Sequence, residues 1–216
     1  MKTIMTVCGA IEAERCGLVL SHEHLFIDLR NQATPNAADR KISSADRAVL
    51  MCDPYCLTDN LCLDCFDLVE QEVKDLHNFS CGTIVDCTLT EIGRNPQQLK
   101  RLSKATSLNI IMGCGWYTAD THPPGFEEMS IGRLADCLVD EILNGVGASG
   151  IRPGIIGEIG TSKTILPGEK KALAAAALAQ KETGLSIQVH IYPWSCNGLE
   201  VLDILFHYGV SPDRIV

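Results

Sequence analysis

The sequence lacks any apolar run close to the ~20 residues that a membrane-spanning helix needs. Basic residues are also scarce, because 18 Lys and Arg stand against 27 Asp and Glu and leave a net charge of −9. This balance argues against nucleic acid and against a membrane surface as partners. The N-terminal stretch has one lysine and a weak apolar run interrupted by Glu12 and Glu14. It therefore predicts a strand and a turn rather than a secretory signal.

Two common catalytic motifs are missing as well. There is no GxSxG nucleophile elbow, and no cysteine sits in a recognisable nucleophile signature, which weakens the hypothesis of an acyl-enzyme hydrolase. The glycine-rich segment GIIGEIGTSKT (154–164) suggests a phosphate loop. The GxxxxGK[ST] register is absent, however, because Lys163 follows Ser162 rather than a glycine. Nucleotide binding is therefore a weak hypothesis.

Cysteine, by contrast, is abundant, with eleven residues. Without a secretory signal we expect reduced thiols in a cytoplasmic protein, many of them acting as small buried apolar residues. The densest cluster is CDPYCLTDNLCLDC, with Cys52, Cys56, Cys62 and Cys65. A structural zinc site is one interpretation, although the CxxxC spacing and the short gap disfavour it. The other is that Cys62 and Cys65 lie at the start of a helix.

Short β-rich runs alternate with helical patterns along the chain. Its 216 residues, 46% of them hydrophobic, suit a single domain over 1–216. The predicted strands cover 17–24, 82–88, 108–115, 154–160 and 185–190, and a sixth begins at 214–216. The predicted helices cover 64–78, a segment that starts at Asn95 as N-cap with Pro96 at N1, and then 130–144, 167–184 and 197–209.

Apolar strands that each precede a helix predict an α/β fold with a parallel sheet. A doubly wound sheet and a (β/α)8 TIM barrel both fit this alternation. In a barrel the chemistry lies at the C-terminal ends of the strands. Here those ends carry His22 and His24, then Asp86, Glu158 and His190. This placement favours the barrel.

The segment LVLSHEHLFID (18–28) pairs two histidines at a spacing of two. Side chains in a strand alternate between its two faces, so His22 and His24 point to the same side. Two imidazoles make a poor apolar core, because each ring has a donor and an acceptor to satisfy. They make good ligands for zinc, nickel or iron. The alternative is that both are ordinary polar residues at a strand end.

Glu158 and His190 extend the pattern to two more strands. A carboxylate within an apolar strand is costly unless it is paired or coordinated. An ion pair with a neighbouring Lys or Arg is the structural explanation for Glu158, and a carboxylate that bridges two metals is the functional one. His190 ends the next strand and faces the mouth that a barrel would have. Together with His22 and His24, these residues have the layout of a metal-dependent hydrolase.

At this point the sequence resembles a known family. The segments TVCGAIEAERCGLVLSHEHLFID, TIVDCTLTEIGRNPQQLKRLSKATSLNIIMGCGWY, MSIGRLADCLVDEILNGV and GIIGEIGTS resemble, in order, the phosphotriesterase family of the amidohydrolase superfamily. Within that family the similarity is greatest to the phosphotriesterase-related proteins. The resemblance implies a TIM barrel and a site for two divalent metals, zinc first and Mn²⁺, Co²⁺ or Fe²⁺ as alternatives.

The resemblance also implies roles for individual residues. His22 and His24 would bind one metal and His190 the other. Glu158 would bridge the two metals, at the position where classical phosphotriesterases have a carbamylated lysine. In the segment WYTADTH, Tyr117 is a candidate for the substrate pocket.

One departure from the family pattern concerns the end of the sequence. The family has a further metal-binding histidine on strand six and a metal-binding aspartate, the general base, on strand eight. Because the sequence ends at Val216, we expect a barrel that is truncated at its C-terminus and an inactive fragment. The catalytic residue is therefore unknown within these 216 residues.

These observations support two functional hypotheses. The first is a hydrolase whose complete form uses a metal-bridging hydroxide to attack a small-molecule ester, lactone, N-acyl amide or phosphoester. The second is a truncated, catalytically inactive protein that binds metal or a partner through the half-built site. Open sheet edges would favour a homo-oligomer in either case.

Overall fold

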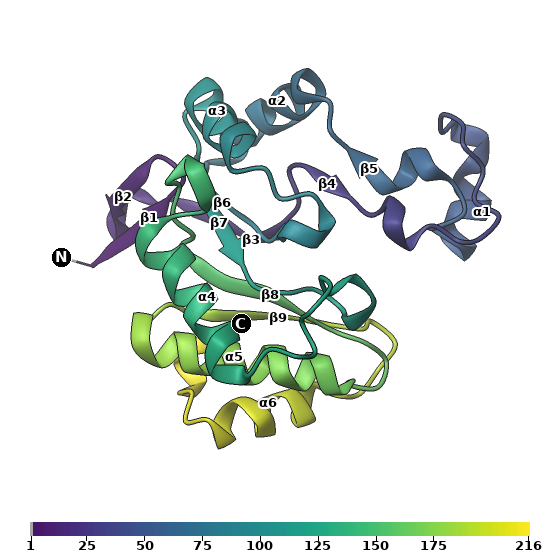
Figure 1. Ribbon diagram of the computed structural model, residues 1–216. Coiled ribbons are helices and arrows are strands. Elements are labelled where there is room, and N and C mark those ends of the chain that lie inside the picture. Colours follow the sequence, from purple (N-terminus) through teal and green to yellow (C-terminus); the bar gives the residue numbers. More distant parts are fainter. Residues whose placement is uncertain (1) are drawn as a thin grey trace.

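The computed structural model describes residues 2–216, and a sheet of five parallel strands forms its centre (Figure 1). The strands, in chain order, are β3 (Leu18–Glu23), β6 (Cys81–Asp86), β7 (Asn109–Cys114), β8 (Ile155–Thr161) and β9 (Ile187–Ile191). Their order in the sheet is the same as their order in the chain. A doubly wound sheet would reverse the strand order at a switch point. That alternative is excluded, and the predicted α/β fold, an incomplete (β/α)8 TIM barrel, is confirmed.

The sheet curls into a half-barrel, so that its first and last strands face one another. The Gln188 side chain on β9 donates a hydrogen bond of 2.9 Å to the carbonyl oxygen of Ser21 on β3. Two glycines allow the close approach of neighbouring strands. A Cβ atom on Gly113 would lie 1.9 Å from the carbonyl oxygen of Gly157, and one on Gly157 would lie 2.2 Å from that of Gln188. Gly157, from the suspected phosphate loop, therefore serves the packing of β8 against β7 and β9.

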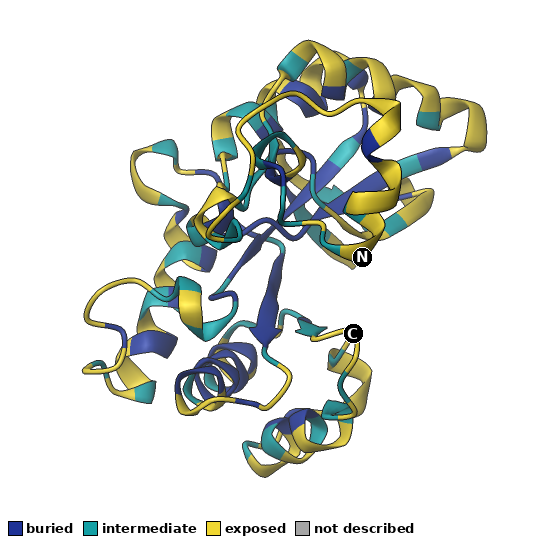
Figure 2. Cartoon of the chain, turned by 90° about the vertical axis from the view of Figure 1, so that its right-hand side faces the viewer, coloured by how far each residue is buried: buried dark blue, intermediate teal, exposed yellow. Residues whose placement is uncertain are grey.

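Five helices accompany the strands: α2 (Phe66–Lys74), α3 (Pro96–Thr106), α4 (Ile131–Asn144), α5 (Pro167–Thr183) and α6 (Gly198–His207). The Asn95 side chain caps α3 by accepting from the Gln98 N–H, with Pro96 at the first position, as predicted. Ser130 caps α4 in the same way. The small side chains of the alanine-rich α5 are buried against the sheet. Gly184, in the left-handed conformation, ends this helix. Buried residues concentrate along the central strands β6, β7 and β8 and in α5 (Figure 2).

The hairpin of β1 (Thr3–Thr6) and β2 (Gly9–Glu12) lies at the N-terminal end of the half-barrel. The Val7 N–H donates to the carbonyl oxygen of Ile110, near the start of β7. The hairpin thus contacts the end of the sheet that is opposite to the predicted site. It agrees with the strand and turn that the N-terminal sequence predicts.

A long excursion, residues 29–61, leaves the half-barrel between two short antiparallel strands, β4 (Ile27–Asp28) and β5 (Cys62–Leu63). It contains α1 (Arg47–Cys52) and stands away from the sheet in Figure 1. No sequence pattern predicts this arrangement, because the two strands are two residues long and are separated by 33 residues.

The predicted strands are observed with ends shifted by one or two residues, and three further elements differ from the prediction. The helix predicted over 64–78 is α helical only over 66–74 and continues as a 3₁₀ turn. The last helix ends at His207, two residues before Gly209. The predicted sixth strand is a single parallel bridge between Ile215 and Ile187. Within residues 2–216, no helix has the length and apolar character to cross a bilayer.

Candidate metal centre

A single buried carboxylate, that of Glu158, holds three histidines around it. Glu158 lies in the middle of β8 and is 1% exposed, and every other residue of the strand is buried as well. His22 Nε2 lies 2.8 Å from Glu158 Oε2, and His24 Nε2 lies 3.2 Å from Oε1. His190 Nδ1, on β9, lies 3.2 Å from Oε2. The four residues predicted as metal ligands are therefore brought together at one point.

The curl of the sheet explains this convergence. β3 and β8 are not neighbours in the sheet, yet His22 on β3 contacts Glu158 on β8. His22 in β3 and His24, the first residue after it, both face Glu158, as the spacing of two predicts. The alternative of an ion pair between Glu158 and a Lys or Arg does not occur within the described residues, where its partners within 4.0 Å are the three histidines.

The histidines govern the charge of this centre. Burial by itself would raise the pKa of the Glu158 carboxyl, but the hydrogen bonds from His190, His22 and His24 together hold that pKa below its usual value. In the same way, the hydrogen bond to Glu158 raises the pKa of His22 against the opposing effect of burial. The buried carboxylate is therefore ionised, as a metal ligand has to be.

The donor set fits a divalent metal. His22, His24 and Glu158 each offer one ligand atom, and these atoms lie within 4.8 Å of one another. Imidazole nitrogens and a carboxylate oxygen are ligands that zinc and neighbouring transition metals accept. His190 approaches the same carboxylate from the adjacent strand. These residues could hold a metal ion.

No second cluster of this kind occurs in the part of the chain that the structure describes. All eleven cysteines are free thiols. Across residues 2–216, the only set of three or more histidine, cysteine or acidic side chains with metal-ligand proximity is His22, His24 and Glu158. The structural zinc interpretation of Cys52, Cys56, Cys62 and Cys65 is therefore not supported.

A cavity of about 510 Å³ opens beside His190, at the C-terminal ends of the strands. Tyr117, predicted for the substrate pocket, lines it, and its hydroxyl lies 3.4 Å from His190 Nε2. Burial raises the pKa of Tyr117, so its hydroxyl stays protonated at neutral pH. Tyr55, which belongs to the excursion, and Trp194, which follows β9, form further aromatic walls. The sequence prediction missed both, because neither lies near a recognisable motif.

The charged residues of this cavity are Lys163 and Asp120, both exposed. Within residues 2–216, Lys163 has no acidic partner closer than the 4.0 Å of an ion pair. Its ammonium group is thus available to a negatively charged ligand. Asp120 supplies the opposite charge to the same cavity.

A buried glutamate, Glu169, ties the walls of the cavity together. It lies in the first turn of α5 and is fully buried. Its Oε1 accepts from the Ser162 hydroxyl at 2.5 Å and from the Ala119 N–H at 3.1 Å, while Oε2 accepts from the Leu166 N–H at 2.8 Å. One carboxylate therefore joins the loop after β7 to the loop after β8. Ala119 and Ser162, one from each loop, are thereby held beside the cavity.

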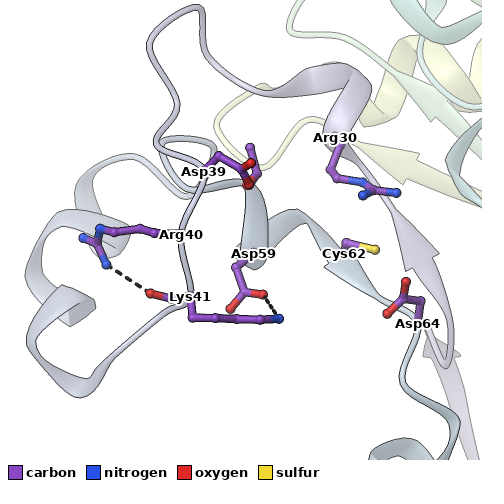
Figure 3. Close-up of a pocket in the computed structure, with 8 residues that line it drawn as sticks. Arg30, Asp39, Arg40, Lys41, Asp59, Cys62 and Asp64 are labelled. Carbon is purple, nitrogen blue, oxygen red and sulfur yellow. Dashed lines mark hydrogen bonds and ion pairs between the residues drawn. The ribbon is translucent and has the colours of Figure 1, made fainter.

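A second cavity, of about 610 Å³, lies within the excursion and the adjoining strand β5 (Figure 3). Three cations line it, and each is already paired with an aspartate: Arg30 with Asp28, Arg40 with Asp46 and Lys41 with Asp59. Burial raises the pKa of the Cys62 thiol that also lines it, so this sulfur is not an activated nucleophile. The cavity therefore lacks a free charge for an anionic ligand.

Comparison with known proteins identifies the family of this chain. The sequence pattern of the phosphotriesterase family matches residues 2–216. The chain belongs to the phosphotriesterase family. It is 36% identical to an N-acetyltaurine hydrolase of Danio rerio over 220 residues, which is 99% of this chain and 63% of that protein. It is also 36% identical to a phosphotriesterase-related protein of Nematostella vectensis, over 98% of this chain and 63% of that protein.

The fold is shared with solved members of the family. The chain superposes with a TM-score of 0.95 on the crystal structure of a resiniferatoxin-binding protein from Rhodobacter sphaeroides. The two are 36% identical, and the match covers 99% of this chain and 62% of that one. The chain thus spans about 63% of the length of the curated relatives it matches. The predicted resemblance to the phosphotriesterase family is confirmed.

Proposed function

We propose that this chain forms the metal-binding part of a metal-dependent hydrolase that cleaves the acyl–nitrogen bond of small N-acylated compounds carrying a negative charge. The observation that carries the proposal is the buried Glu158 carboxyl group with His22, His24 and His190 around it. Relatives named for the hydrolysis of N-acetyltaurine support the amide as the bond and a sulfonate as one example of the charge. Esters, lactones and phosphoesters are the other substrate classes to be tested.

The proposed cofactor is a pair of divalent metal ions, zinc first. When bound, such ions lower the pKa of a water molecule and polarise the bond to be cleaved. Glu158 would supply the negative charge between them, and the three histidines would hold them. The Tyr117 hydroxyl, beside His190, would contact the substrate in the cavity. We assign no general base within residues 2–216.

Glu158→Gln tests the centre directly. The amide keeps the shape of the side chain but loses the charge, so the purified variant should retain much less metal by elemental analysis than the unaltered chain. Glu91→Gln is a matched control, because Glu91 is also a largely buried glutamate but does not contact any of the three histidines. Equal metal content in the Glu158→Gln variant and the unaltered chain would contradict the assignment of Glu158.

An activity assay tests the substrate class. The whole protein, loaded with Zn²⁺ or Mn²⁺, is offered N-acyl amides, lactones, carboxylic esters and phosphotriesters, and the 216-residue chain is assayed beside it. Turnover of an anionic N-acyl amide, lost on chelation and restored by metal, is the expected result. A chain that binds metal but turns over none of these compounds would instead support the hypothesis of an inactive metal-binding protein.

A further inference from the structure

We propose that Thr88 is a positioning residue that fixes the orientation of the His24 ring for metal binding. This inference rests on the proposed metal centre. Thr88 follows β6 and is fully buried. Its Oγ1 lies 3.0 Å from His24 Nδ1, while the other ring nitrogen, Nε2, lies 3.2 Å from Glu158 Oε1.

The backbone explains why Thr88 reaches this place. β3 and β6 are parallel neighbours, and Glu23 is in register with Asp86. Past this pair the two chains stay together, because the Cys87 N–H donates to the carbonyl oxygen of Glu23 at 2.8 Å. His24 directly follows Glu23, and Thr88 directly follows Cys87, so both residues lie at the same edge of the sheet. Their side chains meet because both strands end there.

Asp86 holds the backbone on both sides of this contact. Its Oδ2 accepts from the Leu25 N–H at 2.7 Å, and its Oδ1 accepts from the Thr88 N–H at 3.2 Å. Leu25 directly follows His24, so one buried carboxyl group joins the backbone next to the histidine to the backbone of the threonine. His24 and Thr88 are therefore held side by side by contacts that do not depend on a metal.

The consequence for His24 concerns its two ring nitrogens. Nε2 faces Glu158 and would be the nitrogen that binds the metal. A neutral ring that gives the lone pair of Nε2 to a metal carries its proton on Nδ1, and the Thr88 oxygen lies where it can accept the hydrogen bond from that N–H. A histidine that donates one N–H to an oxygen and presents the other nitrogen to the metal has the arrangement typical of metal sites.

Thr88→Val tests the inference, since it keeps the shape of the side chain and removes the hydroxyl. Metal affinity is measured by titrating the chelator-stripped chain with Zn²⁺ in competition with a chromogenic chelator. Loss of such a neighbouring hydrogen bond typically weakens metal binding roughly 10–100-fold, and that is the expected effect of Thr88→Val. Thr88→Ser restores the hydroxyl and should retain most of the affinity. Loading with Co²⁺ adds a second readout, because its visible spectrum reports the geometry of the ligands.

Thr83→Val is the matched control. Thr83 is a fully buried threonine in β6 itself, and its hydroxyl donates to the carbonyl oxygen of Cys16, away from the centre. This variant should lose stability but not zinc affinity. The inference is overturned if Thr88→Val binds zinc as tightly as the unaltered chain, or if Thr83→Val weakens binding equally. Failure of the unaltered chain to bind zinc would instead overturn the proposed metal centre.

Discussion

The Tyr117 hydroxyl lies 3.4 Å from Nε2 of His190, on the side of the ring opposite to the Nδ1 atom that faces Glu158. One imidazole thus joins the buried carboxylate to the cavity beside it. Tyr117 comes from the loop after β7 and His190 from β9, so the contact crosses the C-terminal end of β8. The site and the cavity are two parts of one arrangement.

Tyr117→Phe should reduce catalysis without unfolding the protein. The ring is largely buried and stays in place, while the hydroxyl next to His190 is lost. A hydrogen bond from this hydroxyl to the substrate would contribute about 1 kcal/mol, so its loss should lower kcat/KM for an N-acyl amide roughly fivefold. The variant should unfold at the same temperature or higher, because phenylalanine brings no polar group into the wall. An unchanged kcat/KM would remove Tyr117 from the substrate pocket.

Much of the centre follows from local patterns in the sequence. The spacing of His22 and His24, an acidic residue inside an apolar strand at Glu158, and a histidine at the end of the next strand are all properties of strands. Alternation and strand order then bring them together, because parallel strands end at one edge. The resemblance to the phosphotriesterase family extended this set to the loop that carries Tyr117.

The walls of the cavity could not be predicted in the same way. Tyr55 reaches it from the excursion, whose position depends on the pairing of β4 and β5 across a long loop. The sequence predicts Glu169 to be a surface residue in the first turn of a helix. In the structure it is fully buried, and it accepts three hydrogen bonds from two loops. Such contacts are tertiary, and no periodicity in the sequence reports them.

Lys163 and Asp120 should have opposite effects on anionic substrates. Both line the cavity and are exposed, so each acts through a partly screened charge. Exposed ion pairs contribute about 0.2–1 kcal/mol, so Lys163→Gln should raise KM up to roughly fivefold and Asp120→Asn should lower it. Steady-state kinetics at low and high salt measure this. An uncharged N-acyl amide of similar size is the control, and equal effects of Lys163→Gln on both substrates would show that the charge is not recognised.

Glu91 should make the folded state less stable as the pH rises. Burial raises the pKa of this carboxyl to about 7, and its Oε2 has no hydrogen-bond partner within the described residues. The folded state therefore binds the proton of this carboxyl more tightly than the unfolded state does, because the ordinary pKa of the carboxyl is 4.5. Stability is greatest below pH 4.5 as far as this group is concerned, and it is lost between about pH 4.5 and 7.

Glu91→Gln isolates that contribution. The free energy of unfolding, measured in urea at pH 5 and at pH 8, should fall by roughly 1–2 kcal/mol more in the unaltered protein than in the variant, after allowance for the partial exposure of the side chain. Other groups that titrate in this range cancel in the comparison. The same difference between pH 5 and pH 8 in both proteins would show that Glu91 is paired or solvated.

The isolated chain should associate with itself through the edges of its sheet. Within residues 2–216, β3 pairs with β6 alone, and two apolar side chains at its start, Leu18 and Val19, are 52% and 42% exposed. An unpaired strand with exposed apolar residues is a template for pairing with another chain. Sedimentation velocity over a range of concentrations should therefore show oligomers.

Val19→Lys places a charge on this edge and should shift the distribution towards monomer. Leu143→Lys is the matched control, because Leu143 is similarly exposed but lies on α4, away from the sheet edge. A monomer at every concentration, or equal dissociation by both substitutions, would show that the edge of β3 is not the contact.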